Sequence, residues 1–258
     1  MKIAYAGFDL FYPALETLYN NGCEIVKIFS CKVDNVTEHN KTINNFAAEH
    51  NIPITFDKIT QGDLEELKNH NIDALFCGAY YYRMPVTDAF PMINIHPSLL
   101  PQGRGAWPMA VYILNNMKKA GITLHKMSEG FDTGDIILQR SFELTQNDNH
   151  ETFMQKANAL LPDMIRELLS DFDTYLDNAT IQGEGEYWEC PDEKDYIITK
   201  DTDFETADRI LRAFYGFYVI YNDGKTEHSI INASAIKGEN TNEVFKIKDG
   251  FICVPKAY

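Results

Sequence analysis

Several marks of specialised protein classes are missing from this sequence. Its five cysteines are odd in number, widely spaced and form no Cys-x-x-Cys pair, so neither a disulfide scaffold nor a zinc ribbon is indicated. The longest apolar run, residues 74–82, is about half the roughly 18 residues that a membrane span needs. Asp9 lies where a signal peptide would keep its apolar run. These absences predict a cytoplasmic protein with reduced thiols and no membrane partner.

Positive charge is scarce as well. The chain of 258 residues carries 23 lysines and arginines against 38 aspartates and glutamates, a net charge of −15. An acidic surface repels phosphate backbones unless a basic patch is concentrated somewhere, so we expect no nucleic-acid partner. Apolar residues make up 45% and charged residues 24% of the chain, which excludes collagen-like and wholly disordered proteins.

Glycine-rich phosphate loops and metal-ligand spacings are also missing. Gly7 is the single glycine of the first expected strand-to-helix turn, and neither G-x-G-x-x-G nor G-x-x-x-x-G-K-[ST] occurs, which disfavours nicotinamide and P-loop enzymes. No cluster of ligand residues has metal-binding spacing, so we expect no metal. Mostly surface or structural roles are expected for His39, His50, His70, His125, His150 and His228.

Short apolar runs alternate with helical patterns over most of the chain, which predicts βαβ units. We expect a doubly wound, mostly parallel α/β sheet that forms one domain over residues 1–180. Pro53 places the third strand near an edge of this sheet. The expected strands are 2–6, 24–29, 52–56, 74–78, 91–95, 121–126 and 136–142. The expected helices are 12–20, 36–50, 62–70, 107–117 and 151–175.

The C-terminal region, residues 181–258, differs in composition from the rest. Ten acidic residues and two lysines lie between 184 and 208, which indicates a solvated connector or an edge. A helix is expected over 206–215, and the turn Asn222-Asp223-Gly224 lies between two strand-like runs and predicts a hairpin. The region is therefore expected to form a small α+β appendix.

Asn94 and His96 are the first candidates for chemistry. They lie two apart on an expected strand, so they face the same side, near the carboxyl end where open α/β sheets bind their ligands. An asparagine amide can donate to a developing oxyanion, and a histidine can move a proton near neutral pH. Asparagine and histidine at strand ends also satisfy loop backbone, so the pair alone leaves both interpretations open.

Asp132 supplies a third group. It lies in a loop bounded by Gly130 and Gly134, between two expected strands of the same sheet. The tripeptide Asp-Thr-Gly is also the signature of aspartic proteases, whose mechanism needs two carboxylates that share a proton. This chain has one copy, and a protease would need a homodimer and an all-β fold, which the βαβ alternation argues against.

Two segments carry a resemblance to a known family. INIHPSLLPQGRGAWP (93–108) and GITLHKMSEGFDTGDIILQ (121–139) resemble the formyltransferases that use 10-formyltetrahydrofolate. The resemblance covers roughly residues 1–180 and is densest over 74–140. It implies a Rossmann-like formyltransferase domain, an N-formyltransferase activity and 10-formyltetrahydrofolate as co-substrate, without a metal.

The resemblance also implies roles for individual residues. Asn94 would stabilise the tetrahedral transition state, His96 would transfer the proton, and Asp132 would raise the pKa of His96. These roles agree with physical chemistry, because a carboxylate beside an imidazole favours its cationic form. A donor aimed at the formyl oxygen stabilises charge that appears only during attack.

Two further segments match the family's folate pocket. The matching positions expected to contact the pterin are Met84, Pro85, Val86, Ser128, Glu129, Gly130 and Phe131. The alternative for the neighbouring tyrosines, residues 80–82, is a surface aromatic cluster, since aromatic residues usually serve packing. Arg104 could bind a phosphate or carboxylate of the acceptor through its planar guanidinium, or it could be a solvated loop charge. Some sugar enzymes of the family carry a second arginine at the position of Ala106, and that contact is absent here.

The length and charge of the C-terminal tail indicate which acceptor the enzyme uses. The family's glycinamide ribonucleotide enzymes end soon after the catalytic domain, and its methionyl-tRNA enzymes need a larger C-terminal barrel and a basic surface. Here the tail is short and acidic. We therefore favour a nucleotide-linked amino sugar as the acceptor, in an enzyme of surface polysaccharide synthesis that forms a homodimer. A methionyl-tRNA formyltransferase-like enzyme and a non-catalytic folate-binding relative remain the alternatives.

Overall fold

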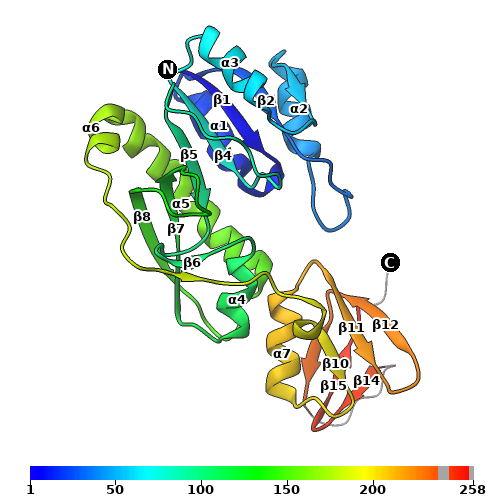
Figure 1. Cartoon of the computed structure of the whole chain (residues 1–258). Helices are drawn as coiled ribbons and strands as arrows, with labels where there is room; N and C mark the ends of the chain where they lie inside the picture. Colours follow the sequence, from blue (N-terminus) through cyan, green and yellow to red (C-terminus); the bar gives the residue numbers. More distant parts are fainter. Residues whose placement is uncertain (238–243, 256–258) are drawn as a thin grey trace. The chain divides into compact units, whose positions relative to one another are not determined.

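The chain forms two units in a computed structural model that describes residues 1–237 and 244–255 (Figure 1). The first unit comprises Met1–Arg104, Gly121–Ser141 and Lys156–Tyr187. The second comprises Gly105–Ala120, Phe142–Gln155 and Trp188–Tyr258. The units are interleaved along the chain, whereas the expected domains 1–180 and 181–258 meet at one boundary. That boundary stays a prediction about which parts fold independently.

A seven-stranded sheet, in the order β3-β2-β1-β4-β5-β7-β8, organises the first unit. β1 pairs in parallel with β2 and β4, β4 pairs in parallel with β5, and β7 joins β5 in antiparallel orientation. The predicted mostly parallel α/β sheet is confirmed. The strands are β1 (Lys2–Gly7), β2 (Glu24–Phe29), β3 (Ile54–Thr55), β4 (Ala74–Gly78), β5 (Met92–His96), β7 (Lys119–Lys126) and β8 (Ile136–Glu143).

The burial of each strand agrees with its place in the sheet. All five residues of β4 are buried, as expected for a central strand covered on both faces. β3 has only two residues, both half-buried, and it lies at the edge that Pro53 predicts. The sheet therefore places the carboxyl ends of β4 and β5 side by side, next to β7.

Helices flank the strands of the first unit (Figure 1): η1 (Asp9–Phe11), α1 (Tyr12–Asn20), α2 (Lys41–Glu49), α3 (Gln61–Asn69), α5 (His150–Ser170) and α6 (Phe172–Asp177). α5 begins in the second unit and continues into the first. α3 begins after Thr60, whose side chain forms a reciprocal capping box with Asp63. The expected helix 151–175 divides at Asp171 into α5 and α6.

α2 begins five residues later than the expected helix 36–50. The carboxylate of Asp34 accepts the backbone N–H groups of Val36, Thr37 and Glu38, which holds this stretch in a turn. Asp9, from η1, accepts the N–H groups of Thr42 and Ile43 and so satisfies the first turn of α2. The start of α2 is therefore set by the carboxylate of Asp9, which is distant in sequence.

The second unit packs two helices and two small sheets around one core. α4 (Pro108–Leu114) and α7 (Phe204–Ala213) contribute buried residues to it, among them Ala110, Ile113, Ile210 and Phe214. β10 (Ile197–Thr199), β11 (Tyr218–Asn222) and β12 (Glu227–Ile231) form one sheet, and β13 (Ser234–Ile236), β15 (Gly250–Cys253) and β14 (Val244–Ile247) form the other. A 3₁₀ turn, η2 (Glu193–Asp195), precedes β10. The predicted hairpin at Asn222-Asp223-Gly224 is confirmed by the antiparallel β11–β12 pair.

A short two-stranded sheet lies beside the main sheet of the first unit. β6 (Gln102–Arg104), which follows β5, pairs in parallel with β9 (Glu186–Tyr187). Just before β9, Thr180 and Ile136 exchange two backbone hydrogen bonds of 2.8 Å. We call residues 180–187 the return segment, because it brings the chain back to the carboxyl end of β5. Within the described ranges, no helix is long and apolar enough to cross a membrane.

Candidate active site

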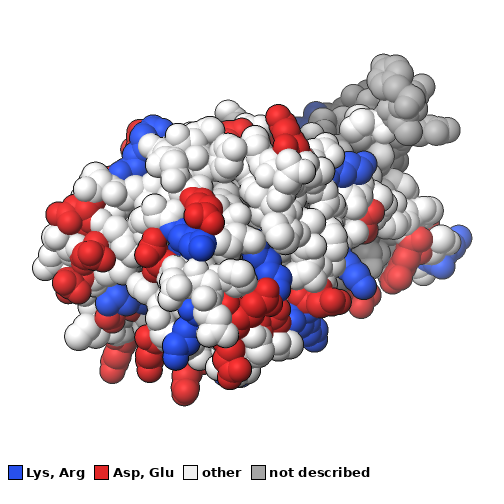
Figure 2. Space-filling model, turned by 90° about the horizontal axis from the view of Figure 1, so that it is seen from above, with Lys and Arg blue, Asp and Glu red and all other residues white. Residues whose placement is uncertain are grey.

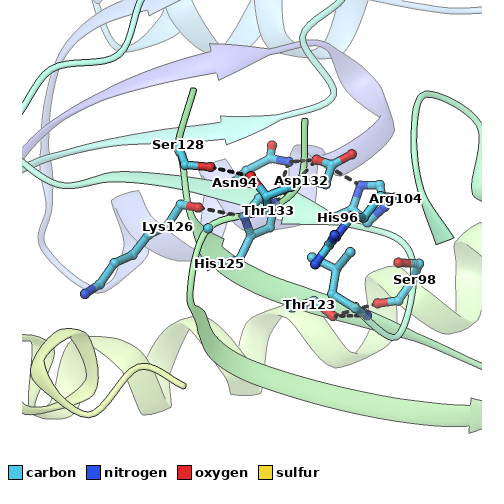
Figure 3. A network of polar contacts seen from close by, with 12 residues as sticks. Asn94, His96, Ser98, Arg104, Thr123, His125, Lys126, Ser128, Asp132 and Thr133 are labelled. Atoms are coloured by element: carbon cyan, nitrogen blue, oxygen red, sulfur yellow. Dashed lines mark hydrogen bonds and ion pairs between the residues drawn. The ribbon is translucent and has the colours of Figure 1, made fainter. Parts of the chain in front are cut away.

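The three expected catalytic residues meet at the carboxyl end of β5 (Figure 3). Asn94 and His96 lie on β5, and Asp132 lies in the loop between β7 and β8. Oδ1 of Asp132 lies 3.3 Å from Nδ2 of Asn94 and 3.6 Å from Nδ1 of His96. The side chains are enclosed, with 14% exposure for Asp132 and 6% for His96. One carboxylate oxygen thus contacts both other groups.

His96 has a defined proton arrangement. Its Nε2 lies 2.7 Å from the carbonyl oxygen of Gly103, which can only accept, so Nε2 carries a proton. In the neutral ring, Nδ1 therefore holds the lone pair and faces Asp132. Burial lowers the pKa of His96 below its ordinary value, while Asp132 and the Gly103 carbonyl raise it. Asp132 acts in the expected direction, but burial is the larger effect, so the ring is suited to accept a proton at Nδ1.

His125 is a fourth member of this network (Figure 3). It lies on β7 directly opposite Asn94, and its side chain is 2% exposed. Nδ1 donates to the carbonyl oxygen of Lys126 at 2.7 Å, which leaves Nε2 as an acceptor 3.1 Å from Nδ2 of Asn94. Nε2 also lies 3.5 Å from Asp132 Oδ1. His125 is therefore buried rather than on the surface, and its structural role lies in the site itself, where it contacts Asn94 and Asp132.

This arrangement fixes the Asn94 carboxamide. Its nitrogen donates both to His125 and to Asp132, and its oxygen points away from them (Figure 3). An amide nitrogen has two protons, so both are directed at these partners. A donor role toward a substrate oxygen therefore requires Asn94 to share or withdraw one of these hydrogen bonds.

The loop that carries Asp132 has an unusual backbone. Asp132 has a φ of 52°, in the left-handed region that costs a residue other than glycine about 1–3 kcal/mol. A Cβ at Gly134 would lie 1.9 Å from the carbonyl oxygen of Lys126, so only glycine fits there. The hydroxyls of Ser128 and Thr133, 2.8 Å apart, close the other side of the loop. The position of the carboxylate thus depends on contacts that hold this loop.

Gln182, in the return segment, supplies such contacts and was not predicted. Its Nε2 donates to the carbonyl oxygens of Asp132 at 2.9 Å and Gly134 at 2.5 Å. Its Oε1 accepts from Nε and Nη2 of Arg104 at 3.2 and 2.9 Å. No sequence pattern marks Gln182, because it lies beyond the matched motifs and reaches the site only through the return of the chain.

Arg104, the expected acceptor-binding residue, lies close to this site. In addition to Gln182, its Nη2 donates to the carbonyl oxygen of Gly183 at 3.0 Å, and the residue is half-buried. The alternative of a solvated loop charge is therefore wrong. These contacts give Arg104 an internal role, and binding of an acceptor by this residue stays a prediction.

The two expected folate-contacting segments lie next to each other. Nη2 of Arg83 donates to the carbonyl oxygen of Glu129 at 3.2 Å, and its guanidinium lies 5.5 Å from the ring centre of Phe131. Met84 is buried in the apolar core with Val86 against it, and Pro85 is half-buried. Phe131 is 59% exposed. Phe131, next to Asp132 in the chain, therefore presents an exposed aromatic ring, on which a flat ring system could stack.

The described part of the chain holds no metal-ligand cluster. No group of three or more histidine, cysteine, aspartate or glutamate residues is arranged there to hold a metal ion.

Comparison with known proteins agrees with this geometry. A family model described as formyl transferase matches residues 12–168. This chain belongs to the formyl transferase family. A methionyl-tRNA formyltransferase of Ehrlichia ruminantium (strain Gardel) is 30% identical over 246 residues, 87% of this chain and 78% of that protein. The same enzyme of strain Welgevonden is 32% identical over 190 residues, 70% of this chain, and the match spans 60% of its length.

Solved structures share the fold. HypX from Aquifex aeolicus in complex with tetrahydrofolic acid has a TM-score of 0.72 and 16% identity, over 98% of this chain and 43% of that one. A methionyl-tRNA formyltransferase from Clostridium thermocellum has a TM-score of 0.64 and 20% identity over 100% of both chains. WlaRD, a sugar 3N-formyl transferase studied with dTDP and 5-N-formyl-THF, has a TM-score of 0.66 and 22% identity over 98% and 96%.

Proposed function

We propose that this protein transfers a formyl group from 10-formyltetrahydrofolate to the primary amine of a nucleotide-linked amino sugar. One observation carries the proposal: a single oxygen of Asp132 contacts Asn94 Nδ2 and lies 3.6 Å from His96 Nδ1, in an enclosed site. A protein that only binds folate has no need for a buried proton acceptor joined to a carboxylate and an amide, so the non-catalytic alternative is disfavoured.

The bound folate would supply an electrophilic formyl carbon. His96 is neutral when free, so its Nδ1 takes the proton that the attacking amine loses. The resulting imidazolium is held between Asp132 and the Gly103 carbonyl, both of which favour the charged ring. Asn94 withdraws one of its two amide protons from His125 or Asp132 and donates it to the oxygen that becomes negative. His96 then returns the proton to the nitrogen that departs, so the ring ends neutral.

Folate fits the apolar surface beside this site. The half-buried Val86 and the exposed Phe131 offer packing for a pterin ring, and Arg83 connects their two segments through its hydrogen bond to the Glu129 carbonyl. The solved structures of HypX and WlaRD were obtained with tetrahydrofolic acid and 5-N-formyl-THF, and this supports a folate donor for the present chain.

Charge supports a small acceptor. The chain has a net charge of −15, and the face in Figure 2 shows lysines and arginines dispersed among acidic residues, without a continuous basic patch among its coloured residues. Neutralisation of phosphates supplies most of non-specific RNA affinity, so such a face favours a substrate that needs one or two cationic contacts. A sugar nucleotide meets this requirement.

A methionyl-tRNA acceptor is the second candidate, and specific observations favour it. The two Ehrlichia ruminantium relatives bear that name, and the Clostridium thermocellum enzyme matches over the whole of both chains. The charge argument and the sequence relatives therefore point to different acceptors.

A direct assay separates the two. The protein is incubated with 10-formyltetrahydrofolate and, in parallel, with dTDP-, UDP- and GDP-linked amino sugars and with methionyl initiator tRNA, and mass spectrometry follows the gain of one formyl group. Formylation of a sugar nucleotide supports the proposal. Formylation of the tRNA alone, with binding that weakens steeply as salt rises, would replace it with the second candidate.

A further inference from the structure

We propose that Gln182 is a positioning residue that holds the Asp132 loop in its reactive geometry and ties that loop to Arg104. The inference rests on the proposed function for its meaning in catalysis, but the contacts that carry it are independent of the acceptor. The Gln182 carboxamide makes four hydrogen bonds: its nitrogen donates two to the loop, and its oxygen accepts two from the Arg104 guanidinium.

The loop needs such an anchor. Asp132 keeps a left-handed backbone, and Gln182 donates to its carbonyl oxygen and to that of Gly134. The Gln182 side chain therefore holds the backbone on both sides of Thr133. Since Asp132 Oδ1 is the atom that meets Asn94 and His96, rotation of this stretch would move the carboxylate away from both.

The return segment is held in place without the Gln182 side chain. Thr180 exchanges two backbone hydrogen bonds with Ile136, and β9 pairs with β6 on the other side of Gln182. A Cβ at Gly185 would lie 2.2 Å from the carbonyl oxygen of Pro101, so the backbone packs closely against the turn that leads to Arg104. A change at residue 182 should therefore leave the segment attached and remove only the contacts of the side chain.

Gln182→Met is the main test, because methionine has a similar length but no donor. We expect kcat to fall by roughly tenfold to a hundredfold, the cost of a misplaced catalytic group, with a thermal midpoint near that of the wild type. Gln155→Met, at an exposed glutamine of α5, is the matched control and should change neither quantity. Unchanged kcat in Gln182→Met would overturn the proposal.

The histidine signals give a readout that does not depend on turnover. The groups that face the His96 ring are Asp132, His125 and the Gly103 carbonyl. If the carboxylate moves away in Gln182→Met, the NMR titration of His96, assigned by its loss in His96→Asn, should move to lower pH than in the wild type. The same titration in both proteins would show that Gln182 does not position Asp132, even if formyl transfer is established. A shift in a protein that formylates no acceptor would uphold the positioning role and reject the proposed function.

A double-mutant cycle separates positioning from general damage. Gln182→Met should add little further loss of kcat in an Asp132→Asn background, because both changes act through the same carboxylate. Fully additive losses would contradict the proposal. Gln182→Glu serves as the second variant should Gln182→Met fail to fold: it keeps an acceptor for Arg104 but cannot donate to the two carbonyls. It should show the same non-additivity.

Discussion

The carboxamide nitrogen of Asn94 lies 3.1 Å from Nε2 of His125, its direct partner on the neighbouring antiparallel strand. The other nitrogen of His125 is committed to the carbonyl oxygen of Lys126, so the ring presents a fixed acceptor to Asn94. A paired strand position therefore decides how the expected oxyanion donor is oriented.

Replacing His125 tests this relationship. His125→Leu removes the acceptor for Asn94, and we expect kcat to fall by roughly tenfold, as for the loss of one hydrogen bond in an enclosed site. His125→Gln can present an oxygen near the position of Nε2 and should recover part of the loss. Equal kcat in the leucine variant and the wild type would show that Asn94 keeps its orientation without this partner.

His96 is expected to carry the proton. His96→Ala should lower kcat by roughly 10²–10⁴, the range for a positioned acid or base, with little change in folate affinity. Steady-state kinetics together with a folate-binding titration measure the two effects separately. Near-normal turnover in this variant would remove His96 from the mechanism.

Asp132 should set the acid limb of the pH–rate profile through His96. The reaction needs neutral His96, so activity falls as pH drops through the pKa of its ring. Burial lowers this pKa and Asp132 raises it. Asp132→Asn removes the raising effect, so the limb should move to lower pH while kcat at the optimum falls. A limb that stays in place or moves to higher pH would contradict the coupling.

Replacing Arg104 shows whether this residue binds the acceptor or only forms hydrogen bonds within the protein. Arg104→Ala should raise KM for the sugar nucleotide by roughly tenfold or more, as for loss of a charge-assisted hydrogen bond of about 1.5–3 kcal/mol, and leave KM for folate unchanged. The kinetics are measured with each substrate varied in turn. If kcat and the thermal midpoint fall instead, with KM for the acceptor unchanged, Arg104 does not bind the acceptor. Its role is then to stabilise the site through its hydrogen bonds to Gln182 and Gly183.

His150 predicts a pH dependence of stability in the second unit. Its Nε2 accepts from Trp107 Nε1 at 3.2 Å, and burial lowers its pKa to about 4. The folded state therefore prefers the neutral ring, and its stability is complete above the unfolded pKa of about 6.5 and falls as pH drops toward 4, by up to about 3 kcal/mol. Unfolding followed by tryptophan fluorescence between pH 7 and 5 should show this loss in the wild type and a smaller one in His150→Gln. Equal losses in both proteins would assign the effect to other groups.

Much of the fold could be predicted from local patterns. Buried runs such as Ala74–Gly78 mark central strands by composition alone, and Pro53 marks an edge by its missing N–H. The start of α2 could not be predicted in the same way, because the carboxylate that receives its first N–H groups belongs to Asp9, more than thirty residues earlier. Such long-range capping leaves no mark in the helix's own sequence.

The residues of the site also differ in whether the local sequence could predict them. Asn94, His96 and Asp132 lie within recognisable motifs at strand ends, and the structure brings them together. His125 lies within a matched motif too, but its importance depends on the antiparallel register of β5 and β7. Gln182 depends on the path of the return segment, which local propensity does not encode.

The interleaving of the two units limits how this chain can be cut or recombined. Ala110 and Ile113 of α4 are buried in the core that α7 completes, although α4 lies among the motifs of the formyl transferase region. A shortened chain that stops before α7 would leave these residues in water and tend to aggregate. A chimaera that exchanges C-terminal parts between relatives must therefore also carry residues 105–120 and 142–155 from the same parent. Grafting at a single junction near residue 180 would combine α4 of one parent with α7 of the other in the core of the second unit.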